Sequence, residues 1–202
     1  MKKLIGVGIL VAVGVGLIAV APMLLDLYRL TDFIATSSRA YEIDGGPWPH
    51  LTDVCEGCHG AAGNPIHQGY PGLAGQPKGY LETQLRHFAS GERRNPTMGP
   101  LALSMSEADI HLLAGYFAGK PALANRAFEA DAARQAQGAR LVESQGCAAC
   151  HGDSFAGRDG FPRLASQGHD YLLRQLDAYA DGSRIEATGT MQRMARSMSS
   201  DE

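Results

Sequence analysis

CEGCHG, at Cys55–Gly60, returns as CAACHG at Cys147–Gly152, and these two hexapeptides hold all the cysteines of the chain. Paired cysteines in an exported protein usually indicate a disulfide framework. Here, however, the cysteines of each pair are separated by only two residues, and a histidine follows each pair directly. The spacing therefore points to a chemistry other than disulfide bonding, and one chain uses that chemistry twice.

The duplication extends over most of the chain after residue 50. Three further segments of the first copy have counterparts in the second: PGLAGQ from Pro71 and PRLASQ from Pro162, YLETQLRHFASGER from Tyr80 and YLLRQLDAYADGSR from Tyr171, and MGPLALSMS from Met98 and MQRMARSMS from Met191. Self-similarity at one offset is the signature of a structural unit used more than once. The sequence predicts two tandem domains, at residues 51–122 and 127–202.

Apolar residues recur with the period of a helix in both copies. One such group is Leu81, Leu85 and Phe88, its counterpart is Leu172, Leu176 and Tyr179, and a glycine follows each group. A capping box is expected where Asp109 follows Ser106 by three residues, and residues 131–145 form another amphipathic stretch. No segment alternates apolar and polar residues as a half-buried strand does, so the sequence predicts an all-α protein.

Each copy lacks one of the expected helices. Gly45–Pro49 stand where the first domain would need a leading helix like residues 131–145. Ser199 and Glu202 repeat the capping signal of the first domain, and no helical stretch follows them in the printed sequence. The C-terminal helix of the second domain is therefore expected to be missing.

The first 30 residues predict a membrane anchor. Lys2 and Lys3 precede the uncharged run Leu4–Leu25, which as a helix would cover about 33 Å, enough to cross a bilayer core. A cleaved signal peptide is the alternative, because Ala19–Ala21 supplies a small-residue exit site. Residues 31–50 are predicted as a linker. The early lysines favour a bacterial inner-membrane location, with both later domains in the periplasm.

Charge excludes one class of partner. The net charge is -3 at pH 7, so the chain has no basic surplus for binding phosphate backbones, and nucleic acid is not an expected partner.

C-x-x-C-H is the attachment signature of c-type haem. Two thiols on one helical turn can add to the two vinyl groups of a porphyrin, and the next residue brings an imidazole under the iron. Zinc binding and dithiol chemistry are the alternatives, but zinc needs four ligands at workable spacing and a thioredoxin-like motif needs neighbouring strands. The sequence predicts two covalently bound haem c groups, held by Cys55, Cys58 and His59 and by Cys147, Cys150 and His151.

The sixth iron ligand separates electron carriers from enzymes. Met98 and Met191 are matched methionines in the loop before each cap signal, and we expect them to complete two His/Met-ligated irons. Met194 is a rival to Met191. Pro71 and Pro162 follow the two histidines at similar distances, so their carbonyl oxygens are expected to accept the hydrogen bonds that orient the imidazoles.

These residues together resemble the tandem dihaem class I cytochromes c of the cytochrome c4 family. The resemblance runs from about Leu51 to the end, on CEGCHG, PGLAGQ and YLETQL with Met98, and on CAACHG, PRLASQ and YLLRQL with Met191. It implies two small helical cytochrome domains with His/Met irons close enough to exchange electrons. It also implies redox protein partners: a quinol-oxidising complex or dehydrogenase as donor, and a terminal oxidase as acceptor.

We therefore expect an electron-transfer protein without substrate chemistry of its own, rather than an enzyme. Methionine ligation favours the reduced iron and closes the coordination sphere to small reactants. A haem subunit fixed within a membrane dehydrogenase or oxidase complex is the first alternative. A dihaem peroxidase is the second, and it would need one iron with an open sixth position.

Overall fold

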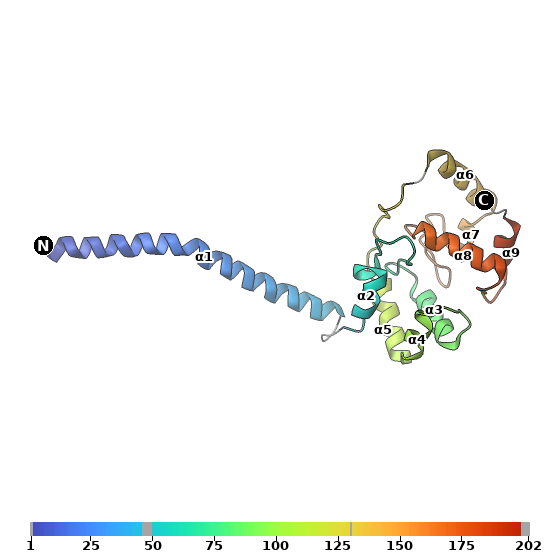
Figure 1. Ribbon diagram of the computed structural model, residues 1–202, viewed down its shortest axis with the longest axis horizontal. Coiled ribbons are helices and arrows are strands. Elements are labelled where there is room, and N and C mark those ends of the chain that lie inside the picture. The colour runs from blue at the N-terminus through green and yellow to red at the C-terminus, as the bar shows by residue number, and fades with distance from the viewer. Residues whose placement is uncertain (1, 46–49, 130, 199–202) are drawn as a thin grey trace. The chain divides into compact units, whose positions relative to one another are not determined.

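The computed structural model describes residues 2–45, 50–129 and 131–198, although the side chains of residues 2–5, 7–13, 15, 17, 18 and 40–45 lie outside the description. The chain divides into two compact units, Met1–His50 and Leu51–Glu202. Within the described residues every regular element is a helix, apart from one isolated bridge between Arg158 and Phe161 (Figure 1). The prediction of an all-helical fold is confirmed.

The first unit is one helix, α1 (Lys2–Gly45), with Pro22 inside it. In the described part of the chain no helix is both long and apolar enough to cross a membrane. α1 continues past the uncharged run Leu4–Leu25 through charged side chains such as Asp26 and Arg29, which pair at 3.6 Å. The prediction of an N-terminal transmembrane helix is therefore wrong, and the predicted attachment to an inner membrane loses its basis.

α1 also covers most of the segment predicted as a linker. It continues through Ser37 and Ser38 to Gly45, and Thr31 in the same segment donates its hydroxyl to the Tyr28 carbonyl at 2.8 Å. Such bonds to the preceding turn let hydroxyl residues stay within a helix. Of the remaining linker residues, 46–49 lie outside the described residues, and His50 is buried.

The first domain of the second unit contains α2 (Asp53–His59), the 3-10 turn η1 (Ala61–Gly63), α3 (Lys78–Ser90), α4 (Met98–Leu103) and α5 (Glu107–Ala118). Its core forms where α3 meets α5, and consists of Leu81, Leu113, Ala114 and Phe117. Cys55 and Met105 pack against this core from the predicted haem-binding segments. The helical core therefore lies directly beside the first C-x-x-C-H turn.

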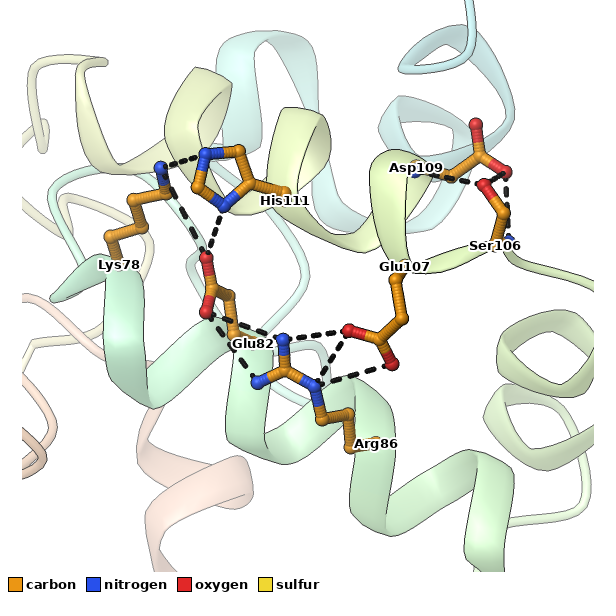
Figure 2. A network of polar contacts seen from close by, with 7 residues as sticks. All are labelled: Lys78, Glu82, Arg86, Ser106, Glu107, Asp109 and His111. Carbon is orange, nitrogen blue, oxygen red and sulfur yellow. Dashed lines mark hydrogen bonds and ion pairs between the residues drawn. The ribbon is translucent and has the colours of Figure 1, made fainter.

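Polar contacts fix α5 against α3 on the solvent side (Figure 2). Arg86 of α3 donates to Glu107 of α5 at 2.9 Å, and His111 of α5 lies between Lys78 and Glu82, at 2.9 Å from each. The hydrogen bond to Glu107 raises the pKa of Arg86, and the same bond lowers the pKa of Glu107. Exposed ion pairs add little stability, so this network sets the register of the two helices more than it stabilises them.

The second domain contains α6 (Ala132–Ser144), α7 (Ala148–His151), α8 (His169–Asp181) and α9 (Thr190–Ser197), and α8 packs against α9 (Figure 1). Its buried apolar residues are few, with Tyr179 and Ala195 the ones below a tenth exposed. In the first domain α5 supplies Leu113 and Phe117 to the core, and no described element does so here. The cap signal at Ser199 and Glu202 lies outside the described residues.

Candidate haem-binding sites

The first C-x-x-C-H turn presents a buried imidazole. Cys55, Cys58 and His59 lie on α2, and the side chain of His59 is 7% exposed. Its Nδ1 donates to the Pro71 carbonyl oxygen at 2.8 Å, which leaves the Nε2 lone pair available. Burial lowers the pKa of His59, and the Pro71 hydrogen bond opposes this only in part. The ring is therefore held neutral, as a metal-ligating imidazole must be.

The second turn repeats this geometry. His151 on α7 is also 7% exposed, and its Nδ1 lies 2.8 Å from the Pro162 carbonyl oxygen. An aromatic ring stands edge-on to each imidazole, from Tyr70 at 6.4 Å in the first domain and from Phe161 at 6.3 Å in the second. The two sites are therefore alike both in the hydrogen bond and in the ring that packs against the histidine.

None of the four cysteines, all of which lie in the described part of the chain, is joined to another by a disulfide bond. Burial, followed by the negative charge of Glu56 and the neighbouring Cys58, raises the pKa of Cys55 to about 11. Burial also raises the pKa of Cys147. Zinc binding and thiol exchange both require thiolates. In the described part of the chain no three His, Cys, Asp or Glu side chains gather closely enough to hold a metal ion.

One large, mainly apolar cavity of about 1710 Å³ runs along both turns. Drug-sized ligands occupy pockets of roughly 300–1,000 Å³, so this cavity has room for more than one such group. All the residues singled out from the sequence line it: Cys55, Cys58, His59, Pro71, Met98, Cys147, Cys150, His151, Pro162 and Met191. The structure thus brings both sets of residues to one continuous space.

The two methionines lie in short helices rather than in the loops expected from the sequence. Met98 is the first residue of α4 and Met191 the second of α9, and both are half-buried. The backbone N–H of Met98 donates to Asn95 Oδ1 at 2.8 Å, and that of Met191 donates to Glu186 Oε1 at 3.1 Å. Sequence reasoning missed both anchoring side chains. An asparagine three residues before Met98 is a known turn signal that could have identified the first.

Met194, the rival ligand, lines the same cavity, as do Met105 and Met198. Equivalence within the repeat separates the candidates, since the position in the first domain that matches Met194 is Leu101.

A reciprocal set of hydrogen bonds joins the two domains beside the cavity. Gln167 of the second domain donates to the Gly72 carbonyl and accepts from the Gly72 N–H, both at 2.8 Å. Gln76 of the first domain does the same with Arg163, at 2.8 and 2.9 Å. Gln76 and Gln167 occupy equivalent positions in the repeat, as do Gly72 and Arg163. The two domains therefore contact one another through the same surface.

Two arginines extend this symmetry. Arg93 donates to the Tyr171 hydroxyl at 3.0 Å, and its counterpart Arg184 donates to the Tyr80 hydroxyl at 3.1 Å. Arg184 is only 7% exposed. Burial opposes its charge, but the nearby oxygens of Tyr80 and Tyr171 hold the pKa of Arg184 above its ordinary value. Neither the tyrosines nor the arginines had a role in the sequence-based prediction.

Two buried arginines, Arg163 and Arg184, show whether the cavity suits a haem group. Arg163 is buried, and its Nε has no hydrogen-bond partner among the described residues, although the side chain lines the cavity. Arg184 lines the same space, and the hydrogen bonds described for its guanidinium go to uncharged groups. Buried cations are stable when they are paired with anions. A haem carries carboxylate groups on an apolar macrocycle, so the apolar walls, the buried imidazoles and the buried guanidinium groups all fit it.

Comparison with known proteins gives the same assignment. A family profile described as cytochrome c matches residues 135–201. A thiosulfate dehydrogenase electron acceptor from Thiomonas intermedia is 41% identical over 140 residues, which are 64% of this chain and 64% of that protein, so less than two thirds of its length is spanned. Cytochrome c4 from Pseudomonas aeruginosa is 32% identical over 154 residues, 72% of this chain and 77% of that protein.

The crystal structure of reduced recombinant cytochrome c4 from Pseudomonas stutzeri has a TM-score of 0.69 to this chain at 30% identity, and covers 78% of this chain and 90% of that one. With the duplicated site geometry already described, these matches show that the chain belongs to the cytochrome c4 family, whose members are electron carriers with two covalently bound haem c groups.

Proposed function

We propose that this cytochrome works in the bacterial periplasm, where it accepts electrons from a thiosulfate dehydrogenase and passes them to a terminal oxidase. The relative named as a thiosulfate dehydrogenase electron acceptor supports this choice of donor, because it matches at 41% identity. The 32% match to Pseudomonas aeruginosa cytochrome c4 supports the wider role of a respiratory carrier.

The observation that carries the proposal is that two equivalent histidines, each held by a proline carbonyl at 2.8 Å, line one cavity together with both cysteine pairs and both methionines. We assign His59 and Met98 as axial ligands of the first haem, and His151 and Met191 as those of the second. Cys55 and Cys58, and Cys147 and Cys150, provide the thioether links.

Haem iron supplies a reversible one-electron change without a change of bound groups. The chain's own residues hold the groups around the iron in place. Pro71 and Pro162 orient the imidazoles, and the short helices α4 and α9 position the methionines. Met98 and Met191 would hold the two irons opposite the histidines, and a haem held in this way would offer no open site to a small reactant. Because both sites line the same cavity, the arrangement supports electron exchange within one molecule.

The proposal is tested by mixing the purified oxidised holoprotein with catalytic amounts of a thiosulfate dehydrogenase and thiosulfate, and following the absorbance of the reduced haem. Rapid reduction that depends on the enzyme is expected. If the protein is reduced by ascorbate but not by this enzyme, the proposed donor is wrong.

The same preparation addresses the two rival functions. Rapid peroxide turnover by the isolated protein would identify a peroxidase and contradict the carrier function. Copurification of a stable catalytic partner without crosslinking would identify a fixed subunit of a larger enzyme instead of a separate carrier.

A further inference from the structure

The two haem-attachment turns differ in charge at one equivalent position. Glu56 stands between the cysteines of the first turn, and Ala148 holds the same place in the second. Asp53 is the first residue of α2, the helix that carries the first pair of cysteines. The N-terminal end of α2 therefore has two acidic residues, Asp53 and Glu56. The repeat has therefore kept the cysteines and the histidine but not the charge between them.

Glu56 is held in place by two donors. Its Oε1 accepts from the Ala62 N–H at 3.0 Å and from the Tyr116 hydroxyl at 3.1 Å, and the side chain is half-buried. Lys120 places its ammonium 4.2 Å from the centroid of the Tyr116 ring. The carboxylate therefore stays beside Cys55 and Cys58 rather than moving freely in solvent.

The second turn offers no such carboxylate. The guanidinium of Arg158 donates a hydrogen bond to the carbonyl of Ala149, a residue that lies between the second pair of cysteines. Asp153 and Asp159 of the same loop are exposed, and exposed charges are largely screened by water and salt. Tyr116 belongs to α5, and the second domain has no counterpart of α5 among its described helices.

A fixed negative charge favours the more positive state of a nearby group. Ferric haem carries one more positive charge than ferrous haem, so a carboxylate beside the site stabilises the oxidised form. The charge of Glu56 already raises the pKa of Cys55 in addition to burial, whereas no charged group contributes at Cys147. The electrostatic field therefore differs between two turns that are otherwise alike.

We propose that the fixed carboxylate of Glu56 lowers the reduction potential of the haem in the first domain, and so favours electron transfer from that haem to the haem in the second domain. In the half-reduced protein one electron leaves the first iron, which becomes ferric, and arrives at the second, which becomes ferrous. No proton or atom changes partner. The inference rests on the proposed assignment of the two sites, and Glu56 acts as a positioning charge that does not itself bind iron.

Glu56→Gln tests this charge with little change of shape. Glutamine keeps an oxygen that can accept from Ala62 and Tyr116, so the turn should fold as before. In spectroelectrochemical titrations of the holoprotein, the midpoint potential of the haem in the first domain should rise. The ratio of electron occupancy between the second and first haem should fall by about threefold to tenfold. Haem-methyl NMR signals, assigned through contacts to residues of each domain, identify which haem has shifted.

Ala148→Glu is the reciprocal variant. It should lower the midpoint potential of the haem in the second domain, and so reduce the difference between the two midpoint potentials. The effect should be smaller than that of Glu56→Gln, because no residue equivalent to Tyr116 would fix the new carboxylate. Glu129→Gln, in the exposed segment before α6, removes the same charge outside both turns and should leave both potentials unchanged.

If Glu56→Gln shifts neither potential, shifts the second haem more than the first, or moves both no more than Glu129→Gln does, the inference is wrong. Reduction by a thiosulfate dehydrogenase could still occur in that case, so this result and a failure of the proposed function remain distinguishable.

Discussion

Gly60 and Gly152 end the two haem-attachment turns with the same backbone conformation, at φ 76°, ψ 166° and φ 81°, ψ 155°. This region is accessible almost only to glycine. The surroundings differ, however. A Cβ on Gly60 would lie 2.1 Å from the Asn64 carbonyl oxygen, whereas a Cβ on Gly152 would meet nothing within 4 Å. A comparison of alanine substitutions at Gly60 and Gly152 therefore distinguishes the cost of backbone strain from the cost of steric overlap.

Gly152→Ala should destabilise the holoprotein by about 1–3 kcal/mol, the ordinary cost of this backbone conformation for a residue with a side chain. Gly60→Ala should cost more, because the Asn64 backbone must also move. Denaturant unfolding followed by far-UV circular dichroism measures both variants under identical conditions. Equal losses, or a larger loss for Gly152→Ala, would contradict the described packing of the first turn.

The sequence was sufficient to predict the residues whose role depends on local spacing. Cys55, Cys58 and His59 follow one another on a single turn, so their arrangement required no knowledge of the fold. The contacts of Glu186 and Glu56 with backbone or side chains elsewhere depend on how loops return to the helices. Such contacts have no fixed sequence offset, and they became visible only in the structure.

At the scale of single helices, α5 shows how a cap defines an element. Ser106 Oγ accepts from the Asp109 N–H at 3.2 Å, and Asp109 Oδ2 accepts from the Ser106 N–H at 2.9 Å (Figure 2). The Ser106 hydroxyl also donates to Asp109 Oδ2 at 2.7 Å, and this bond, followed by the bond from the Ser106 N–H, lowers the pKa of Asp109. The capping box predicted from the sequence is confirmed.

Ser106→Ala should destabilise the protein by about 1 kcal/mol, because the helix loses its N-terminal acceptor. Ser104→Ala is the matched control: its hydroxyl contacts only the Leu101 carbonyl at an exposed position, so its effect should stay within about 0.5 kcal/mol. Thermal or denaturant unfolding at neutral pH measures both. A loss for Ser104→Ala as large as that for Ser106→Ala would contradict the capping role.

Acid should remove the contribution of Asp109. Because the pKa of this carboxyl is lower in the folded protein than in the unfolded chain, its stabilising effect is fully present above the unfolded pKa and is lost as the pH falls through the folded pKa. The stability difference between the wild type and Asp109→Asn should therefore shrink on acidification. Unfolding curves recorded between neutral and acidic pH test this, and a difference that is constant with pH would contradict it.

Long amphipathic helices with caps could be predicted from the sequence, and short ones could not. α6 agrees with the predicted stretch 131–145 within one residue at each end, and α3 contains the predicted apolar group and ends at its predicted stop, Gly91. α4 and α9 are too short for a periodic pattern, and the side chains that hold their first turns come from the preceding loops. At the N-terminus the apolar run predicts a membrane span, and this prediction is wrong for the helix that the structure describes.

At the scale of the whole molecule, the two haem domains act as one unit because equivalent residues exchange partners across their interface. Gln76 and Gln167 each bind both backbone groups of a residue in the other domain. Both glutamines are buried, and an unpaired buried backbone group costs about 1–3 kcal/mol. The repeat predicted that two domains exist, but nothing in one copy indicates which of its surfaces meets the other.

Gln167→Ala should lower the stability of the whole protein by about 2–4 kcal/mol, since it leaves the N–H and the carbonyl of Gly72 unpaired. Gln76→Ala should have a similar effect through Arg163. Gln135→Ala, at an exposed position of α6, should change stability by no more than about 0.5 kcal/mol. Calorimetry should also show the single unfolding transition of the wild type separating into two in the Gln76→Ala/Gln167→Ala double variant. One unchanged transition in the double variant would mean that these bonds do not couple the domains.

The central claim is that each domain holds its haem iron between a histidine and a methionine, so that both sites exchange electrons and bind no reactant. The near-infrared charge-transfer band between methionine sulfur and ferric iron tests it most directly, in the wild type, Met98→Ala, Met191→Ala and the double variant. The account predicts a band that falls to about half in each single variant and disappears in the double variant. A full band in either single variant would contradict the assignment of that methionine as a ligand.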